Sequence, residues 1–209
     1  MVNSEQEGVI KYSLEYRETQ PVEFRDLEAL ERCRQKFRAL GLIGGGNPQR
    51  YEGLGFGNVS HRLAPGSGAF VISGTQTGHL ESMGAEGYAL VTSCDPARNS
   101  IVAEGAVRPS SEAMTHAVIY RQLPAVQAVI HVHSPQIWRH AGKLGLPRTA
   151  PEVPYGTPAM ATEMQRLIAS GMGGWHTISM AGHEDGVITW GETLDAASGE
   201  LEALFRKVA

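Results

Sequence analysis

Short runs of apolar residues, separated by turn residues, predict the strands of this chain. Runs rich in valine and isoleucine that are too short for a typical helix are typical of buried strands. Turn chemistry interrupts them, as at Pro65-Gly66-Ser67-Gly68 and at Asp95-Pro96. The predicted strands are a short one near 8–14 and those at 58–63, 69–73, 88–93, 100–103, 125–133, 177–180 and 187–190.

Apolar residues at helical spacing predict helices before, between and after these strands. Asp26, a serine of Ser110-Ser111, and Thr157 before a proline are the expected capping residues. The predicted helices span 26–40, 109–122, 135–141, 157–170 and 193–208. The strands come in hairpin-like clusters and do not alternate regularly with helices. We therefore predict an α/β fold, a three-layer α/β/α sandwich around a largely antiparallel central sheet.

Length and composition favour one globular domain. The chain has 209 residues, and 42% of them are hydrophobic, which is enough for a substantial core. We interpret residues 1–24 as a polar N-terminal lead-in and residues 25–209 as a single domain.

Charge and cysteine usage exclude several classes of partner. The formal net charge is −4 and the basic residues form no block, so we expect no nucleic-acid partner. No stretch approaches the roughly 20 apolar residues of a membrane span, and the polar N-terminus does not resemble a signal peptide. Cys33 and Cys94 lie far apart and form no CxxC motif. We interpret them as reduced core residues of a cytoplasmic protein.

His131 and His133, at the end of an apolar run, are the most informative residues of the chain. Side chains two apart on a strand share a face, about 6.5–7 Å apart, which suits two imidazoles that bind one divalent cation. The alternative is a pair of core histidines bonded to backbone carbonyls. A third ligand is then needed, and His183 lies at a turn between two apolar strands, where sheets present ligands. Glu184 and Asp185 beside it are interpreted as ordinary turn acids. Four more histidines lie in polar or turn-rich segments and have no second histidine at strand spacing. They are His61, His79, His140 and His176.

Three corners rich in glycine or hydroxyl groups are candidates for holding a small anion. They are Gly57-Asn58-Val59-Ser60, Ser73–Gly78 and Ser110-Ser111, and each alone is commonly a plain turn or cap. Glu112 follows at the start of a helix. The helix dipole alone favours a carboxylate there, and the alternative is that Glu112 serves as a metal ligand or a general base. His116, one turn later, is interpreted as a core residue or one that supports the site.

Five stretches in this order resemble the class II aldolase/adducin family, which includes fuculose-phosphate aldolase, ribulose-phosphate epimerases and methylthioribulose-phosphate dehydratase. The likeness covers about residues 27–205. The matching stretches are Gly57-Asn58-Val59-Ser60 with Arg62, Thr77-Gly78, Pro109-Ser110-Ser111-Glu112, His131-Val132-His133, and the His183 turn leading to Gly186-Val187-Ile188.

The resemblance implies a site and an assembly. It implies that a zinc ion, or another divalent metal, is bound by His131, His133 and His183. Glu112 would complete the metal shell or act as acid and base. It also implies an α/β/α fold and a homotetramer. The residues that would hold the substrate phosphate are Gly57, Asn58, Thr77, Gly78, Ser110 and Ser111.

The function so implied is that of a zinc-dependent aldehyde-lyase of aldolase type in carbohydrate metabolism. Its substrate would be a small hydroxy-ketose, a sugar phosphate, cleaved through a metal-stabilised enediolate. The alternatives are an epimerase or dehydratase that uses the same site, or a non-catalytic adducin-like module for metal binding or assembly. Several features differ from the family. The segment 134–153 is shorter than in sugar-phosphate aldolases, and Tyr155 does not match the tyrosine that some members place in a neighbouring site. The His183 turn is longer than in many relatives, and the loop Ser73–Gly78 carries an extra glycine and Gln76.

Overall fold

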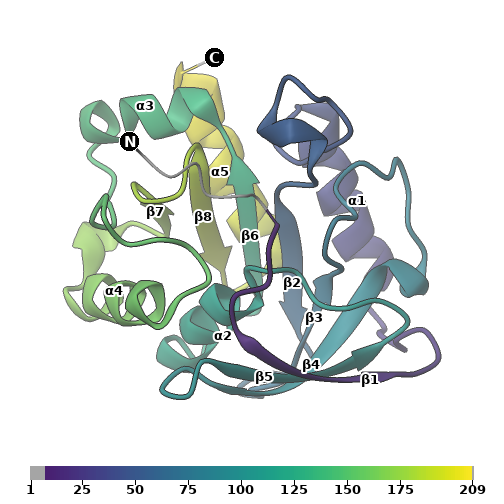
Figure 1. Cartoon of the computed structure of the whole chain (residues 1–209). Coiled ribbons are helices and arrows are strands. Elements are labelled where there is room, and N and C mark those ends of the chain that lie inside the picture. The colour runs from purple at the N-terminus through teal and green to yellow at the C-terminus, as the bar shows by residue number, and fades with distance from the viewer. Residues whose placement is uncertain (1–7, 209) are drawn as a thin grey trace.

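The computed structural model describes residues 8–208, in which the strands form one mixed sheet (Figure 1). The order across the sheet is β1-β5-β4-β3-β2-β6-β8-β7. The expectation of a polar terminus without a signal peptide concerns residues 1–7, which lie outside the described part. The strands are β1 (Ser13–Glu18), β2 (Asn58–Arg62), β3 (Phe70–Ser73), β4 (Tyr88–Asp95), β5 (Ser100–Gly105), β6 (Ala128–His133), β7 (Thr177–Ser179) and β8 (Gly186–Gly191).

Strand pairing confirms a largely antiparallel sheet. Among the described strands, β1 and β5 are parallel, and the other neighbours run antiparallel. The apolar runs predicted each of the central strands to within a few residues. The strand expected near 8–14 is displaced, because regular pairing with β5 starts only where Ser13 lies opposite Ser100.

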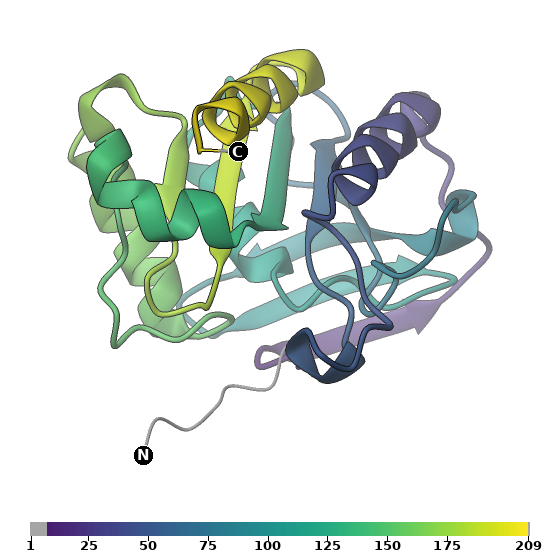
Figure 2. The same cartoon turned by 90° about the horizontal axis from the view of Figure 1, so that it is seen from above.

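Helices cover both faces of the sheet, which confirms the three-layer α/β/α architecture (Figure 2). One core lies under α2 and α4, and the other lies under α1, α3 and α5. None of these helices has the length and apolar character that a membrane span requires. The helices are α1 (Leu27–Ala39), α2 (Ala113–Gln122), α3 (Pro135–Leu144), α4 (Pro158–Ala169) and α5 (Leu194–Val208).

One of the three expected helix caps forms as predicted. Asp26 stands at the N-cap position of α1 but makes no side-chain capping hydrogen bond. Thr157 Oγ1 accepts the N–H of Met160 at 3.3 Å, as the capping chemistry predicts. The predicted serine cap of α2 is wrong, because the helix begins only at Ala113, after Glu112. Ser110 belongs to the preceding loop, since its N–H donates to the carbonyl of Ser73 at 3.2 Å. A long-range backbone bond therefore delays the start of α2.

A buried ion pair fastens α1 to the loop before β4. Arg34 is 1% exposed, and its guanidinium donates to both carboxylate oxygens of Glu31 at 2.7 Å. The same guanidinium donates to the carbonyls of Leu80 and Glu81, and the Tyr88 hydroxyl donates to Glu31 at 2.6 Å. Burial alone would raise the pKa of Glu31, but the hydrogen bonds from Arg34 and Tyr88 hold that pKa below its usual value.

Candidate metal and substrate site

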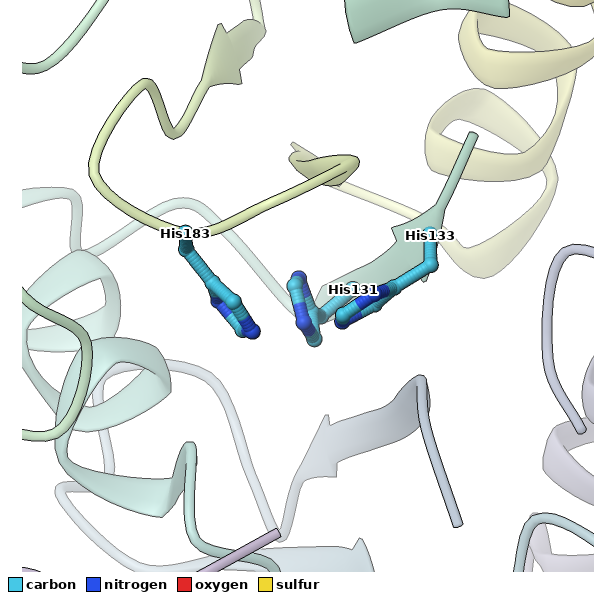
Figure 3. A group of neighbouring side chains, drawn as sticks. All are labelled: His131, His133 and His183. Carbon is cyan, nitrogen blue, oxygen red and sulfur yellow. The ribbon is translucent and has the colours of Figure 1, made fainter. Parts of the chain in front are cut away.

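Three histidines from two distant segments converge at one end of the sheet (Figure 3). One ring nitrogen of each of His131, His133 and His183 lies within 4.8 Å of the others. The ring centroids are 5.1 Å apart for His131 and His133, 5.1 Å for His131 and His183, and 4.7 Å for His133 and His183. All three side chains are buried. The structure thus brings together the three residues that were expected to bind a metal.

The alternation of β6 directs two of these imidazoles to the same face. Val129 packs in the core under α2 and α4, whereas Ile130 and Val132 pack in the opposite core. His131 and His133 follow the parity of Val129 and so face the layer that contains α2. The start of α2 lies on this same side of the sheet.

His183 reaches the other two rings because its turn is closed by several hydrogen bonds. The N–H of Met180 donates to the carbonyl of Gly186 at 2.8 Å, and the N–H of His183 donates to Met180 at 3.0 Å. Trp138 Nε1 also donates to the Met180 carbonyl at 2.9 Å. A Cβ at Gly186 would lie 3.1 Å from the His183 ring, so glycine suits this position. Gly186 pairs with His133 across β8 and β6, which fixes where the turn emerges.

The surroundings of two of the three histidines suit the neutral imidazole, the form that binds a metal. Burial, with His183 and Arg50 nearby, lowers the pKa of His133 well below its usual value. His131 Nδ1 lies 3.2 Å from the carbonyl of Val187, which can only accept, so Nδ1 carries the proton and Nε2 the lone pair. A backbone carbonyl in this role is the usual support for a metal-binding histidine. Three buried imidazoles are a donor set that fits zinc or a similar divalent ion.

Glu112 lies beside this group. Its Oε1 is 3.6 Å from Nδ1 of His183, and the side chain is 1% exposed. A carboxylate at this distance is close enough to join a metal shell or to exchange a proton with a group bound there.

The three corners that were candidates for an anion pocket meet next to the histidines. Asn58 lies opposite His131 in the pairing of β2 with β6. Gly57 has φ +73°, and a Cβ there would lie 2.7 Å from Cγ1 of Ile43 and 3.2 Å from the His131 carbonyl oxygen. The positive φ and the lack of space for a Cβ both favour glycine at the position before Asn58. Asn58 Oδ1 is buried and has no hydrogen-bond partner among the described residues.

The second and third corners are joined to the first by close backbone contacts. A Cβ at Gly78 would lie 2.9 Å from the carbonyl oxygen of Phe56, just before Gly57. The Ser110 N–H donates to Ser73 at the start of the second corner, and Ser110 and Ser111 are 5% and 4% exposed. The Thr77 hydroxyl donates to the Gly74 carbonyl at 2.7 Å, so this side chain shapes the turn.

Several aromatic and charged residues near the histidines were not expected from the sequence. Tyr155 stacks on His183 with ring centroids 4.5 Å apart, and Tyr51 meets His133 edge-on at 4.7 Å. The interpretation of Asp185 as an ordinary turn acid is wrong, because it is 7% exposed and accepts the Tyr51 hydroxyl at 2.7 Å. No local pattern marks these residues. Their contacts join separate segments of the chain, and the contact between Tyr51 and Asp185 spans 134 positions.

His116 lies in the interior and is not one of the three converging rings. It is 0% exposed, and its Nδ1 shares a hydrogen bond of 2.7 Å with Oγ of Ser60. Ser60 in turn shares a hydrogen bond of 2.8 Å with the Tyr120 hydroxyl. His116 therefore belongs to a buried polar network between β2 and α2.

Comparison with sequence families shows one match that spans most of the chain. The model of the class II aldolase and adducin N-terminal domain matches residues 49–207. Among curated proteins, the methylthioribulose-1-phosphate dehydratase of Methylococcus capsulatus is 29% identical over 173 residues, which are 71% of this chain and 78% of that protein. The enzyme of the same name from Xanthomonas euvesicatoria is 28% identical over 169 residues, or 70% and 73% of the two chains.

Solved structures with the same fold include proteins of this family. YgbL of Escherichia coli superposes with a TM-score of 0.63 at 21% identity, over 87% of this chain and 85% of that one. The L-fuculose-1-phosphate aldolase of Thermus thermophilus gives a TM-score of 0.57 at 20% identity, over 87% and 90% of the two chains. At these identities the likeness establishes the fold.

Proposed function

The chain belongs to the class II aldolase and adducin family, and on that premise we propose that it is a metal-dependent lyase of a phosphorylated ketose. The observation that carries this proposal is the convergence of His131, His133 and His183, with Glu112 at 3.6 Å from His183. A non-catalytic module for metal binding or assembly has no need of a buried carboxylate beside three buried imidazoles. An acid and base next to a cation is what a lyase requires.

We propose that the three histidines hold a zinc ion. When bound, the ion supplies positive charge close to the substrate oxygens on which negative charge develops. Glu112 takes a proton from, or returns it to, the carbon next to the substrate carbonyl. Its burial at the start of α2 keeps it in reach of that carbon and away from bulk water.

We propose that the corner residues bind and orient the substrate phosphate. Gly57 and Gly78 lie too close to other chain segments for a side chain to fit. Their amides are proposed donors to the phosphate. The Asn58 amide and the hydroxyls of Ser110 and Ser111 add neutral donors close to the start of α2, where the helix dipole favours an anion. The full set is Gly57, Asn58, Thr77, Gly78, Ser110 and Ser111. An anchor of this kind fixes the reacting carbon against the carboxylate.

Elimination of water is the first candidate reaction. It is supported by the curated relatives, which are named methylthioribulose-1-phosphate dehydratases and of which the chain covers about three quarters. In this reaction Glu112 removes the proton from carbon, and the hydroxyl on the adjacent carbon leaves as water after it is protonated. Aldol cleavage, expected from the sequence, uses the same residues, and its support is the family membership.

Metal analysis tests the site itself. Purified protein that has been stripped with a chelator and reloaded is expected to hold about one zinc per chain. His133→Ala should abolish retention. His140→Ala removes a histidine whose Nδ1 bonds to the Gln136 carbonyl of its own helix, and this variant should retain the metal. Zinc-free wild-type protein after reloading would refute the proposal.

Product analysis separates the two reactions. Zinc-loaded protein is incubated with methylthioribulose 1-phosphate or with fuculose 1-phosphate, and the products are identified by mass spectrometry. Loss of one water identifies a dehydratase, and release of a triose phosphate identifies an aldolase. Glu112→Gln should keep the metal and lower kcat by roughly 10²- to 10⁴-fold in either case. An unchanged kcat would remove Glu112 from the mechanism.

A homotetramer and a cytoplasmic location remain predictions from the sequence. Light scattering on the eluate of a gel-filtration column tests the first, since a tetramer of 22.5 kDa chains is far larger than a monomer. Cell fractionation tests the second.

A further inference from the structure

Two neighbouring residues, Arg50 and Tyr51, connect the two segments that carry the histidines. Arg50 Nη2 donates to the carbonyl of His133 at 2.9 Å, at the end of β6. The Tyr51 hydroxyl donates to the carboxylate of Asp185 at 2.7 Å, two residues after His183. One short loop thus holds both the strand with two histidines and the turn with the third.

The ring of His133 is enclosed by the same loop. Tyr51 meets it edge-on with centroids 4.7 Å apart and an interplanar angle of 73°. Phe56 lies at 5.5 Å from His133, and the Arg50 guanidinium lies 4.2 Å above the Phe56 ring. Arg50 is itself held by a second bond, from Nη1 to the Gly41 carbonyl at 2.6 Å. These contacts restrict the orientation of one imidazole of the trio.

The backbone on both sides of the Tyr51–Asp185 hydrogen bond is strained. Tyr51 has φ +48°, Glu52 has φ +56° and Asp185 has φ +61°, a region that residues with a side chain rarely adopt. Such conformations persist where the surroundings hold them, and they cluster at functional sites. The N–H of Ser134 donates to the Asp185 carbonyl at 2.8 Å, which further fixes the turn.

We propose that Arg50 and Tyr51 act as a clamp that fixes the spacing between His133 and His183 and thereby sets the affinity of the site for its metal. This inference rests on the proposed function, since it takes the three histidines as a cation site. Tyr51 is a positioning residue in this scheme, acting through Asp185 and the His183 turn. Residues that orient metal ligands in this way typically change metal affinity by about 10- to 100-fold when they are replaced.

Cobalt binding is the test, because Co²⁺ can replace zinc and its visible spectrum reports the geometry of its ligands. Tyr51→Phe removes the hydroxyl and keeps the ring against His133. We expect it to weaken Co²⁺ binding by about 10- to 100-fold in competition with a chelator, and to change the absorption spectrum. Asp185→Gly should have the same effect, since glycine tolerates the positive φ and offers no acceptor.

Two further variants separate positioning from general stability. Asp185→Asn keeps an acceptor oxygen and tolerates the left-handed backbone, so it should bind Co²⁺ nearly as wild type does. Tyr88→Phe is the matched control, because it removes a buried hydroxyl–carboxylate bond of 2.6 Å, to Glu31, in another part of the fold. It should lower the melting temperature and leave the Co²⁺ affinity and spectrum unchanged.

The outcomes distinguish the clamp from the site. If wild type binds Co²⁺ and Tyr51→Phe binds it with the same affinity and spectrum, the clamp is wrong and the metal site stands. If Tyr88→Phe weakens Co²⁺ binding as much as Tyr51→Phe does, the effect is one of stability and the clamp is also wrong. If wild type binds neither Co²⁺ nor Zn²⁺, the proposed function fails and the clamp with it.

Discussion

His116 is expected to limit the stability of the metal-free protein in acid. The residue is fully buried between β2 and α2, and burial lowers its pKa to about 3. In the unfolded chain the same imidazole has its ordinary pKa of 6.5. Between these two values the unfolded state binds a proton that the folded state does not. Stability must therefore fall as the pH is lowered through this window.

The size of the effect follows from the two pKa values. For one proton, each unit by which the pH falls within this window lowers the free energy of unfolding by about 1.4 kcal/mol. Integrated from about pH 6.5 to about pH 4.5, His116 removes about 2 kcal/mol from the free energy of unfolding.

Urea unfolding, followed by tryptophan fluorescence in the presence of a chelator, measures this contribution. His116→Asn is the variant of choice, because its amide can bond to Ser60 near the position of Nδ1 and does not titrate. The cavity that the smaller side chain leaves lowers stability by the same amount at every pH. The pH dependence of the difference between the two proteins thus isolates the proton.

Wild type should lose about 2 kcal/mol more than His116→Asn between about pH 6.5 and about pH 4.5. Above about pH 7.5 the two curves should run parallel, since the imidazole is then neutral in both states. His133, whose pKa is also lowered, contributes equally to both proteins and cancels. Parallel curves across the acid range would show that His116 is protonated in the folded state, and would refute the argument from burial.

Three further predictions concern stability and the metal. Zinc at about 100 times its dissociation constant should add about 2.7 kcal/mol and raise Tm by roughly 6 °C in differential scanning fluorimetry, and His183→Ala should lose the shift. Arg34→Met leaves the Glu31 carboxylate buried and should cost about 3–5 kcal/mol in urea unfolding; a loss below about 1 kcal/mol would contradict this. Gly78→Ala places a Cβ 2.2 Å from the Gly44 carbonyl oxygen, and should destabilise the protein by about 1–3 kcal/mol in thermal unfolding; an unchanged Tm would show that the loop yields without cost.

Most secondary structure could be predicted because it depends on local patterns. The alternation along β6 predicted that His131 and His133 share a face, and the pairing of Thr157 with Pro158 predicted the start of α4. The start of α2 could not be predicted in the same way. The Ser110 N–H bonds to Ser73 on a distant strand, and this bond outweighs the capping preference of a serine.

Local sequence was enough to predict the strand pair of imidazoles, the third histidine at a turn and the carboxylate at the start of a helix. It was enough because the direction of a side chain follows from strand periodicity and from turn position. That these groups lie together was decided by the tertiary structure, in which β8 pairs with β6 and sets Gly186 opposite His133. The contact between Tyr51 and Asp185 was decided there alone, across 134 positions. A hydrogen bond between two loops produces no periodic pattern in the sequence of either loop, because it depends on how the whole sheet is assembled.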